Sequence, residues 1–373
     1  MQTAIEQYLA QRLEERNAAG NKRQLPSVRD GIDFYSNDYL GLAKNTSIVN
    51  NYSSGSTGSR LLSGNSKAAV ELEQYLAGFH QTESALLFNS GYDANMGLIA
   101  AIANRHTTIL YDELSHASII DGIRLSFCKQ HFRFRHNDAT DLENKLKKYN
   151  DADVPIVVVI ESVYSMEGDI APLENIAALC KKYHAALVVD EAHATGVFGN
   201  NGEGMVQQLQ LQDEVFARVH TFGKALGCHG AVVAGSSLLI NYLVNFARPF
   251  IYTTALPPQA IGHIRDGYMQ LERNPGAREK LHEHIRYFNL RKKNIAAAYW
   301  LESISPIQSL ITAGNEQTKK LARQCEENGF WVSAIVSPTV AKGSERIRIC
   351  LHSFNTREEI DLLLNHLQLC LEK

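Results

Sequence analysis

The sequence predicts an α/β protein whose main domain is a mostly parallel sheet with helices on both faces. Between about residues 84 and 235, short apolar runs alternate with segments of helical periodicity. This alternation is typical of parallel strands joined by helices. One run, Ile156–Ile160, is apolar throughout, as expected for a strand that is buried on both faces.

The expected elements follow in a regular order. Strands are expected at 84–88, 107–111, 155–160, 186–190, 217–221 and 231–235. Helices are expected at 66–80, 91–103, 116–127, 140–149 and 173–184, and a polar amphipathic helix at 1–20. Residues 33–42 are expected to form a structured loop. The Ser/Gly-rich segment 52–65 is either a flexible connector or a structured segment, and its composition leaves both open.

The pattern changes near residue 260. Long helices are expected at 259–272, 278–301 and 315–328, two short strands at 331–335 and 346–350, and a last helix at 356–371. This order predicts a smaller α+β domain that begins after the corner Leu256-Pro-Pro258. We therefore expect an N-terminal arm over 1–45, a large domain over 46–258 and a small domain over 259–373.

The composition excludes several classes of protein. Lys and Arg number 37 against 40 Asp and Glu, which gives a net charge of −3, and no long basic block suggests a nucleic-acid partner. The apolar runs are too short to span a bilayer, and the N-terminus lacks a secretory pattern. Six cysteines without a C-x-x-C pair indicate reduced thiols, no metal site and a cytoplasmic protein.

Two charged residues stand at or just after the ends of predicted strands, and both would bind one cofactor. Asp190 closes the buried run 186–190, where a carboxylate is costly unless it is paired. Lys224 follows the strand 217–221, where partial loss of solvent suits a nucleophilic lysine. Pyridoxal phosphate needs such a pair, because an amine forms a Schiff base with its aldehyde and a carboxylate keeps its ring nitrogen protonated. The sequence therefore predicts pyridoxal phosphate as the cofactor.

Other candidates lie at the carboxyl ends of predicted strands, where ligands of open α/β sheets bind. Gly91 and Tyr92 open a helix whose free amides suit a phosphate, and Thr221 could add a hydroxyl. His116 could stack on a bound aromatic ring. Each of these residues alone also fits an ordinary turn or helix start. Their occurrence in order, each after a strand, favours the site.

The ring's phenolic oxygen has two candidate partners, Ser165 and His193. The run Asp190-Glu-Ala-His193 also matches the DEAH box of helicases, whose acidic residues serve magnesium and water. A helicase requires a Walker loop of the form G-x-x-x-x-G-K-[ST]. Gly223-Lys224 is followed by Ala225, so the helicase interpretation is disfavoured.

The order of motifs along the chain resembles that of the α-oxoamine synthases, which are fold-type I pyridoxal phosphate enzymes. The motifs are Ser36–Leu42, Gly58–Asn65, Ser90-Gly91, His116–Gly122, Ser165–Asp169, Asp190–His193 and Thr221–Lys224. This resemblance covers nearly the whole chain. It implies a fold-type I transferase with a mostly parallel seven-stranded sheet in the large domain, and a homodimer whose active sites are shared.

Within the family, five stretches are most like members that act in biotin biosynthesis: 34–39, 58–65, 247–258, 338–341 and 346–349. They imply an acyltransferase that condenses L-alanine with a pimeloyl thioester, on CoA or acyl carrier protein, with loss of carbon dioxide. Alternatives are the same chemistry on glycine and acetyl-CoA, amino transfer, and a binding protein that kept the fold without catalysis. The segment between Leu42 and Tyr52 is shorter than is usual in the family.

The resemblance also implies roles for single residues. Lys224 becomes the Schiff-base lysine, Asp190 the partner of the ring nitrogen and His116 the ring-stacking residue. The full set of implied cofactor contacts is Gly91, Tyr92, His116, Ser165, Asp190, His193, Thr221, Lys224, Thr253 and Thr254, the last two reaching the neighbouring subunit's cofactor. The implied substrate contacts are Asn37 and Arg348 for the carboxylate, Thr339 on the acyl path, and Arg23, with Lys22 as a competitor, for the acyl chain.

Overall fold

The computed structural model describes residues 3–25, 31–44, 55–149, 154–295 and 298–372. Its contacts divide the chain into two compact units. Unit 1 consists of Met1–Ser36, Met166–Asp169 and Leu281–Lys373, and unit 2 of Asn37–Ser165 and Ile170–Lys280. Residues 259–280, which were expected in the small domain, group with unit 2. There Tyr268 packs edge-to-face on Tyr75, and Glu272 accepts a hydrogen bond from the Tyr75 hydroxyl.

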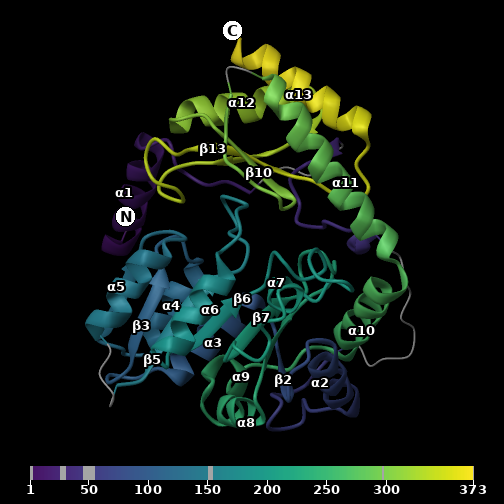
Figure 1. The fold of residues 1–373 in the computed structure, drawn as a ribbon. Coiled ribbons are helices and arrows are strands. Elements are labelled where there is room, and N and C mark those ends of the chain that lie inside the picture. The colour runs from purple at the N-terminus through teal and green to yellow at the C-terminus, as the bar shows by residue number, and fades with distance from the viewer. Residues whose placement is uncertain (1–2, 26–30, 45–54, 150–153, 296–297, 373) are drawn as a thin grey trace. The chain divides into compact units, whose positions relative to one another are not determined.

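Unit 2 is built on a seven-stranded sheet (Figure 1). Its strand order is β2-β8-β7-β6-β5-β3-β4. The strands are β2 (Ser84–Phe88), β3 (Thr108–Asp112), β4 (Gln130–Phe134), β5 (Ile156–Glu161), β6 (Ala186–Asp190), β7 (Ala217–Thr221) and β8 (Ala231–Gly235). Only β8 runs antiparallel to its neighbours, and the other pairs are parallel. The mostly parallel seven-stranded sheet is thereby confirmed.

Helices cover this sheet because alternate side chains of each strand point to opposite faces. The helices of unit 2 are α2 (Lys67–Phe79), α3 (Gly91–Ile102), α4 (Ala117–Leu125), α5 (Ala139–Tyr149), α6 (Leu173–Lys182), α7 (Met205–Gln208), α8 (Ser237–Phe246), α9 (Arg248–Ile251) and α10 (Pro258–Arg273), with the short turn η1 (Leu42–Lys44). Val157 and Val159 share one core cluster with Leu98 of α3 and Leu243 of α8. Each such fully buried side chain stabilises the fold by roughly 1.5–3 kcal/mol.

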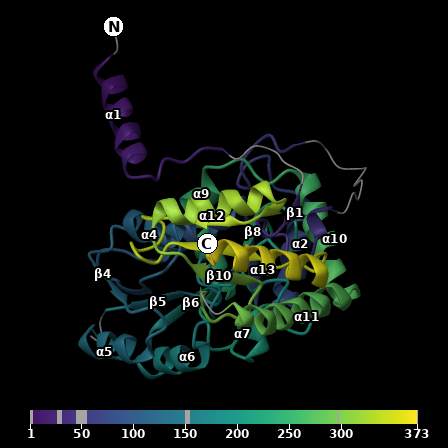
Figure 2. The ribbon, with the colours of Figure 1, turned by 90° about the horizontal axis from the view of Figure 1, so that it is seen from above.

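Unit 1 contains a four-stranded antiparallel sheet in the order β12-β13-β10-β9. Its elements are α1 (Ala4–Ala18), β1 (Ile32–Asp33), η2 (Lys292–Asn294), β9 (Tyr299–Trp300), β10 (Ile307–Ile311), α12 (Asn315–Glu327), β11 (Phe330–Trp331), β12 (Ser333–Ile335), β13 (Arg346–Cys350) and α13 (Arg357–Leu371), together with most of α11 (Pro275–Arg291). Helices α12 and α13 lie side by side (Figure 2). No helix in the described ranges is long and apolar enough to cross a bilayer.

Three sequence-based expectations differ from the structure. Strand β4 was not predicted, because its sequence Gln-His-Phe-Arg-Phe is polar and lies at the sheet edge. Strand β10 was also missed. The helix expected over 278–301 is wrong beyond Arg291, where α11 ends. Further on, the backbone of β9 pairs with β10, and this pairing outweighs the local helical pattern.

The described part of the Ser/Gly-rich segment, 55–65, is attached to unit 2 rather than a flexible connector. Arg60 forms an ion pair with Glu73 at 2.7 Å, and both side chains are largely buried. The Gly58 carbonyl accepts a hydrogen bond from the Ala255 amide. Residues 45–54, which include most of the segment expected to be short, lie outside the described residues.

Two buried histidines stack inside unit 2. The rings of His80 and His220 are 3.7 Å apart at their centroids, and both are fully buried. His80 Nε2 pairs with the Tyr268 hydroxyl, and His220 Nδ1 pairs with Thr195 Oγ1. Burial, with the charge of Arg218 as a further cause, holds the pKa of both rings well below the usual value. Both histidines are therefore neutral in the folded protein.

This pair predicts a loss of stability in acid. Below a pH of about 6.5 the unfolded chain binds protons at these histidines that the folded chain does not bind. The free energy of unfolding should therefore increase as the pH rises toward about 6.5. As the pH falls below that value, it should decrease by up to about 1.4 kcal/mol per pH unit for each histidine. Urea unfolding at several pH values would measure the slope. In the double variant His80→Gln, His220→Gln the slope should shrink, and an unchanged slope there would contradict the assignment. His184→Gln serves as a control.

Candidate active site

The strands that end at one edge of the sheet carry most of the predicted site. Asp190 is the last residue of β6, Thr221 is the last residue of β7, and Lys224 lies in the turn after β7. His116 caps α4 after β3, and Ser165 follows β5. Figure 1 shows strands β3, β5, β6 and β7 of this sheet. Because the carboxyl ends of parallel strands meet at one edge, the five residues belong to one region of unit 2.

The start of α3 forms a small polar space with β7. Ser90 caps the helix, since its hydroxyl accepts a hydrogen bond from the Asp93 amide at 3.1 Å. A Cβ at Gly91 would lie 3.3 Å from Thr221 Cβ and 3.4 Å from its Oγ1. A side chain at position 91 would therefore crowd the space between the helix amides and the Thr221 hydroxyl. First-turn amides have no partner within their own helix, so this space suits an anion.

The side chain of Tyr92 contacts Asp121 and His116. Its hydroxyl donates to the Asp121 carboxylate, and this hydrogen bond raises the pKa of Tyr92. Its ring lies edge-on to the ring of His116, with centroids 6.2 Å apart. Tyr92 can thus contribute its backbone amide to the space at Gly91 and its ring to the surroundings of His116.

Asp190 is held by two donors. Its side chain is buried, Oδ1 accepts a hydrogen bond from the Ala192 amide at 2.8 Å, and Oδ2 accepts one from Asn95 Nδ2 at 2.6 Å. These bonds orient the carboxylate at the end of β6. The buried apolar residues that precede it in β6 keep the strand in the sheet.

His116 is anchored by its backbone and its ring. Its amide donates to Glu161 Oε1 at 2.6 Å, and its Nδ1 lies 2.7 Å from Ser118 Oγ. Burial lowers the pKa of His116, the charge of Lys224 lowers it further, and the charge of Asp190 opposes both. His116 is therefore a neutral imidazole at neutral pH, and it lies within electrostatic reach of both charged candidates.

A second histidine is joined to the N-terminal part of unit 2. The Tyr39 hydroxyl lies 2.8 Å from His193 Nδ1 and donates to Asn37 Oδ1 at 3.1 Å. Because the hydroxyl proton goes to Asn37, His193 Nδ1 is the donor to Tyr39. Tyr39 thus brings two predicted site residues together. Tyr39 was not predicted as a site residue, although it stands inside the Ser36–Leu42 motif.

Thr253 and Thr254 are tied to the segment after β2. Asn89 Nδ2 donates to Thr253 Oγ1 at 3.0 Å and to the Thr254 carbonyl at 2.9 Å. Asn89 was not predicted as a site residue, and its position directly before the Ser90-Gly91 motif was the available signal.

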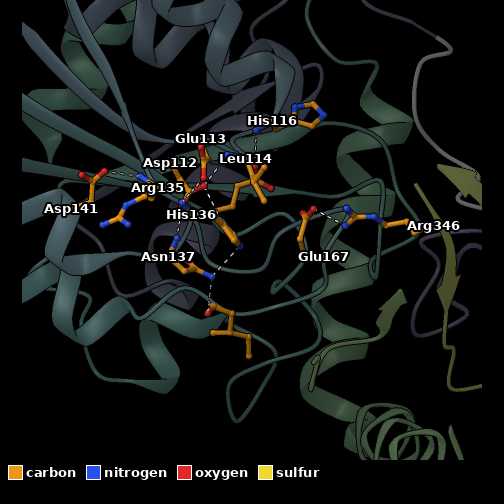
Figure 3. A network of polar contacts seen from close by, with 12 residues as sticks. Asp112, Glu113, Leu114, His116, Arg135, His136, Asn137, Asp141, Glu167 and Arg346 are labelled. Carbon is orange, nitrogen blue, oxygen red and sulfur yellow. Dashed lines mark hydrogen bonds and ion pairs between the residues drawn. The ribbon is translucent and has the colours of Figure 1, made fainter. Parts of the chain in front are cut away.

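A buried polar network supports the segment that leads to His116 (Figure 3). The fully buried Asp112 accepts hydrogen bonds at 2.9 Å from the amides of Leu114 and Asn137 and pairs with His136 Nδ1 at 2.9 Å. His136 in turn lies edge-on to the Tyr164 ring. The network joins the turns after β3, β4 and β5, and so fixes the backbone just before His116.

The remaining predicted residues belong to unit 1, which the structure describes by itself. Arg348 is buried in β13, opposite Ser309 of β10 and Ser333 of β12. Thr339 is exposed and donates its amide to the Val336 carbonyl. Arg23 and Lys22 are exposed in the coil after α1. Their proposed contacts with substrate stay predictions. Within the described ranges, no group of three His, Cys, Asp or Glu side chains could hold a metal ion.

Comparisons with known proteins identify the family of the chain. Residues 29–367 match the family model of aminotransferase class I and II. The 8-amino-7-oxononanoate synthase of Lysinibacillus sphaericus is 37% identical over 375 residues, covering 99% of this chain and 96% of that protein. The crystal structure of 8-amino-7-oxononanoate synthase from Francisella tularensis has a TM-score of 0.79 and 30% identity, over 91% of this chain and 97% of that one.

A second enzyme has a closely similar fold. Serine palmitoyltransferase from S. paucimobilis, solved with a bound PLP–myriocin aldimine, has a TM-score of 0.90 and 27% identity, over 99% of this chain and 98% of that one. The fold-type I architecture is therefore confirmed. On its matched family model and its near full-length relatives, the chain belongs to the aminotransferase class I and II family and, within it, to the family of the 8-amino-7-oxononanoate synthases.

Proposed function

We propose that this protein is a pyridoxal 5′-phosphate-dependent acyltransferase of biotin biosynthesis. It condenses L-alanine with a pimeloyl thioester, on CoA or acyl carrier protein, and yields 8-amino-7-oxononanoate, carbon dioxide and the free thiol. The relatives of this name match almost the whole chain. The observation that carries the proposal is the gathering of His116, Asp190, Thr221 and Lys224 at one edge of the unit 2 sheet.

The residues of unit 2 fit the cofactor. Lys224 supplies the amine that binds its aldehyde, and Asp190 supplies a buried, oriented carboxylate for its ring nitrogen. The space between Gly91 and Thr221 suits its phosphate, because a side chain at position 91 would occupy that space. The neutral ring of His116 can stack on an aromatic ring without adding a charge beside it. When bound, the cofactor supplies an electron sink for charge that develops at the substrate's α-carbon.

The side chains then divide the work of catalysis. Lys224 Nζ takes the α-proton of the amino acid as a general base and later returns a proton to the product. The Asp190 carboxylate would hold the proton on the cofactor's ring nitrogen, and Ser165 and His193 would hold its ring hydroxyl. Thr253 and Thr254 would reach the cofactor phosphate of a neighbouring subunit.

The motif resemblance also assigns the residues of substrate recognition. Asn37 and Arg348 hold the amino acid carboxylate, and a guanidinium can do so with two parallel hydrogen bonds. Thr339 lies on the path of the acyl chain, and Arg23 or Lys22 binds the chain's distal carboxylate. These assignments come from the motif resemblance, and the burial of Arg348 within β13 is compatible with a fixed, specific contact.

A matrix of substrates tests the proposal. L-alanine, glycine and L-serine would each be combined with pimeloyl-CoA, acetyl-CoA and palmitoyl-CoA, and alanine also with the pimeloyl acyl carrier protein. Thiol and carbon dioxide release would be measured. We expect alanine with a pimeloyl thioester to give the highest kcat/KM, exceeding glycine by about tenfold or more, since one methyl group in an apolar pocket discriminates to that extent.

Other outcomes of the same matrix would overturn the proposal. A preference for glycine with acetyl-CoA, or for serine with palmitoyl-CoA, would assign a different condensation. The serine arm is included because the serine palmitoyltransferase fold is so similar. Conversion of the cofactor to its amine form by an amino donor alone, without carbon dioxide release, would indicate amino transfer. Absence of any turnover would favour a binding protein.

The proposal includes a homodimer with shared sites in the cytoplasm. Three large apolar side chains on α8 and directly after α9 are exposed in the single chain, namely Leu238, Phe246 and Tyr252, and they would be covered by a second subunit. All six cysteines lie in the described residues and are free thiols. Free thiols are typical of a reducing compartment.

A further inference from the structure

One buried side-chain amide in unit 2, that of Asn95, bonds to Asp190 and is linked through Ser118 to His116. Asn95, in the second turn of α3, is only 2% exposed. Its Nδ2 lies 2.6 Å from Asp190 Oδ2 and 3.1 Å from Ser118 Oγ. Ser118 Oγ, in turn, lies 2.7 Å from His116 Nδ1. Four side chains from α3, α4 and β6 thus form a continuous chain of hydrogen bonds.

The direction of each hydrogen bond in this chain is determined. The atom that faces the Asp190 carboxylate must be a donor, so the Asn95 NH₂ group points at Asp190 Oδ2 and Ser118 Oγ. Ser118 Oγ accepts from Asn95, and its own proton is left for His116 Nδ1. The Ser118 amide also donates to His116 Nδ1, at 3.2 Å. Nδ1 is therefore an acceptor, and the ring proton of His116 resides on Nε2.

We infer that Asn95 is a positioning residue whose single amide both orients the Asp190 carboxylate and selects the Nε2–H tautomer of His116. The inference rests on the proposed function insofar as Asp190 and His116 contact the cofactor. In that setting the same amide aligns the partner of the ring nitrogen and keeps the stacked imidazole neutral.

A purely structural role for Asn95 explains the observations less well. Among the described residues, Asn95 Oδ1 is buried without a hydrogen-bond partner. A buried polar atom left unpaired is unfavourable, and an apolar side chain at this helix position would avoid that cost. What Asn95 provides and an apolar residue cannot is the pair of N–H donors, one for each neighbour.

The isosteric variant Asn95→Asp tests the inference, because it replaces the donor group by acceptors. At 2.6 Å from Asp190 Oδ2 the new carboxyl group would share one proton with that carboxylate. It would also accept the Ser118 hydroxyl proton, so that Ser118 Oγ becomes an acceptor for His116 Nδ1. The Nδ1–H form of His116 should then gain population, in competition with the Ser118 amide, which still donates toward Nδ1. The measurement is a long-range ¹H–¹⁵N correlation spectrum of cofactor-free protein labelled at the histidine nitrogens, at neutral pH. The His116 signals are assigned from their loss in His116→Gln.

We expect the Nε2–H form alone in the wild type and a mixture with the Nδ1–H form in Asn95→Asp. Asn245→Asp, which changes an exposed amide on α8, should leave the His116 signals unchanged. An Nδ1–H form in the wild type, or an unchanged tautomer in folded Asn95→Asp, overturns the inference. If Asn95→Asp does not fold, Asn95→Ala takes its place. It frees Ser118 Oγ to accept from His116, and both tautomers should then be populated.

A second readout is the dissociation constant of pyridoxal phosphate from the apoprotein. Asn95→Ala should raise it about tenfold or more, because a hydrogen bond to a charged group is lost. Ser118→Thr, which keeps the hydroxyl, should bind the cofactor within about twofold of the wild type, and Ser118→Ala should bind it more weakly. Equal dissociation constants for Asn95→Ala and the wild type would overturn the inference.

The two readouts separate this inference from the proposed function. The tautomer is measured without cofactor, substrate or turnover. A protein that gives the expected tautomer change but fails to make 8-amino-7-oxononanoate would refute the proposed reaction and retain Asn95 as the residue that determines the His116 tautomer. Correct turnover with an unchanged tautomer in Asn95→Asp would support the proposed reaction and refute the role of Asn95.

Discussion

Replacing Lys224 by alanine is expected to abolish turnover, with a loss of at least about 10⁴-fold in kcat, because the amine acts both as the covalent partner of the cofactor and as the general base. Lys224 lies in a partly exposed turn after β7, so the fold should persist. Initial rates of carbon dioxide release from alanine and a pimeloyl thioester would measure the loss.

A covalent readout accompanies the rate measurement for Lys224. Borohydride treatment followed by peptide mass spectrometry should attach the cofactor to Lys224 of the wild type and leave Lys224→Ala unmodified. The cofactor should still bind that variant without a covalent bond. Lys181→Ala is a suitable control, because Lys181 is an exposed lysine paired with Glu214 and its removal should change kcat by less than about twofold. Near-normal activity in Lys224→Ala would refute the assignment.

Replacing Asp190 by asparagine is expected to lower kcat/KM by about 10²–10³-fold, the range found when one preorganised electrostatic contact is lost. The amide has the size of the carboxylate but not its charge, so it cannot hold the proton on the ring nitrogen. The cofactor's absorbance should also respond to pH where the wild type does not.

The geometry predicts a stability cost for Asp190→Asn as well. Both oxygens of Asp190 accept from donors, the Ala192 amide and Asn95 Nδ2. An amide at position 190 would have to turn its NH₂ group toward one of these donors, and a buried donor would lose its acceptor, at roughly 1–3 kcal/mol. Urea unfolding of the apoprotein would measure this cost. Asp213→Asn, at an exposed carboxylate, should change neither property. Wild-type kcat/KM in Asp190→Asn would show that Asp190 does not hold the ring nitrogen.

Much of the fold followed from local patterns. The limits of β2, β6, β7 and β8 agree with the strands expected from the sequence, since short apolar runs between turn residues are a local signal. The residues at the site also carried a local signal, because each of Asp190, Thr221 and Lys224 follows or ends such a run. The predictions failed for strands that carry no such local signal. Strand β4 is polar, and β9 depends on pairing with a distant strand.

The sequence by itself determined which residues bear the chemistry, because residue type and position after a strand are both local properties. Only the tertiary structure decided which of them touch. Asn95 meets Asp190 across 95 positions of chain, and Tyr39 meets His193 across 154. Such contacts depend on strand order and on how helices pack over the sheet. Periodicity does not encode either, because it reports which face of an element is buried and not which element lies against that face.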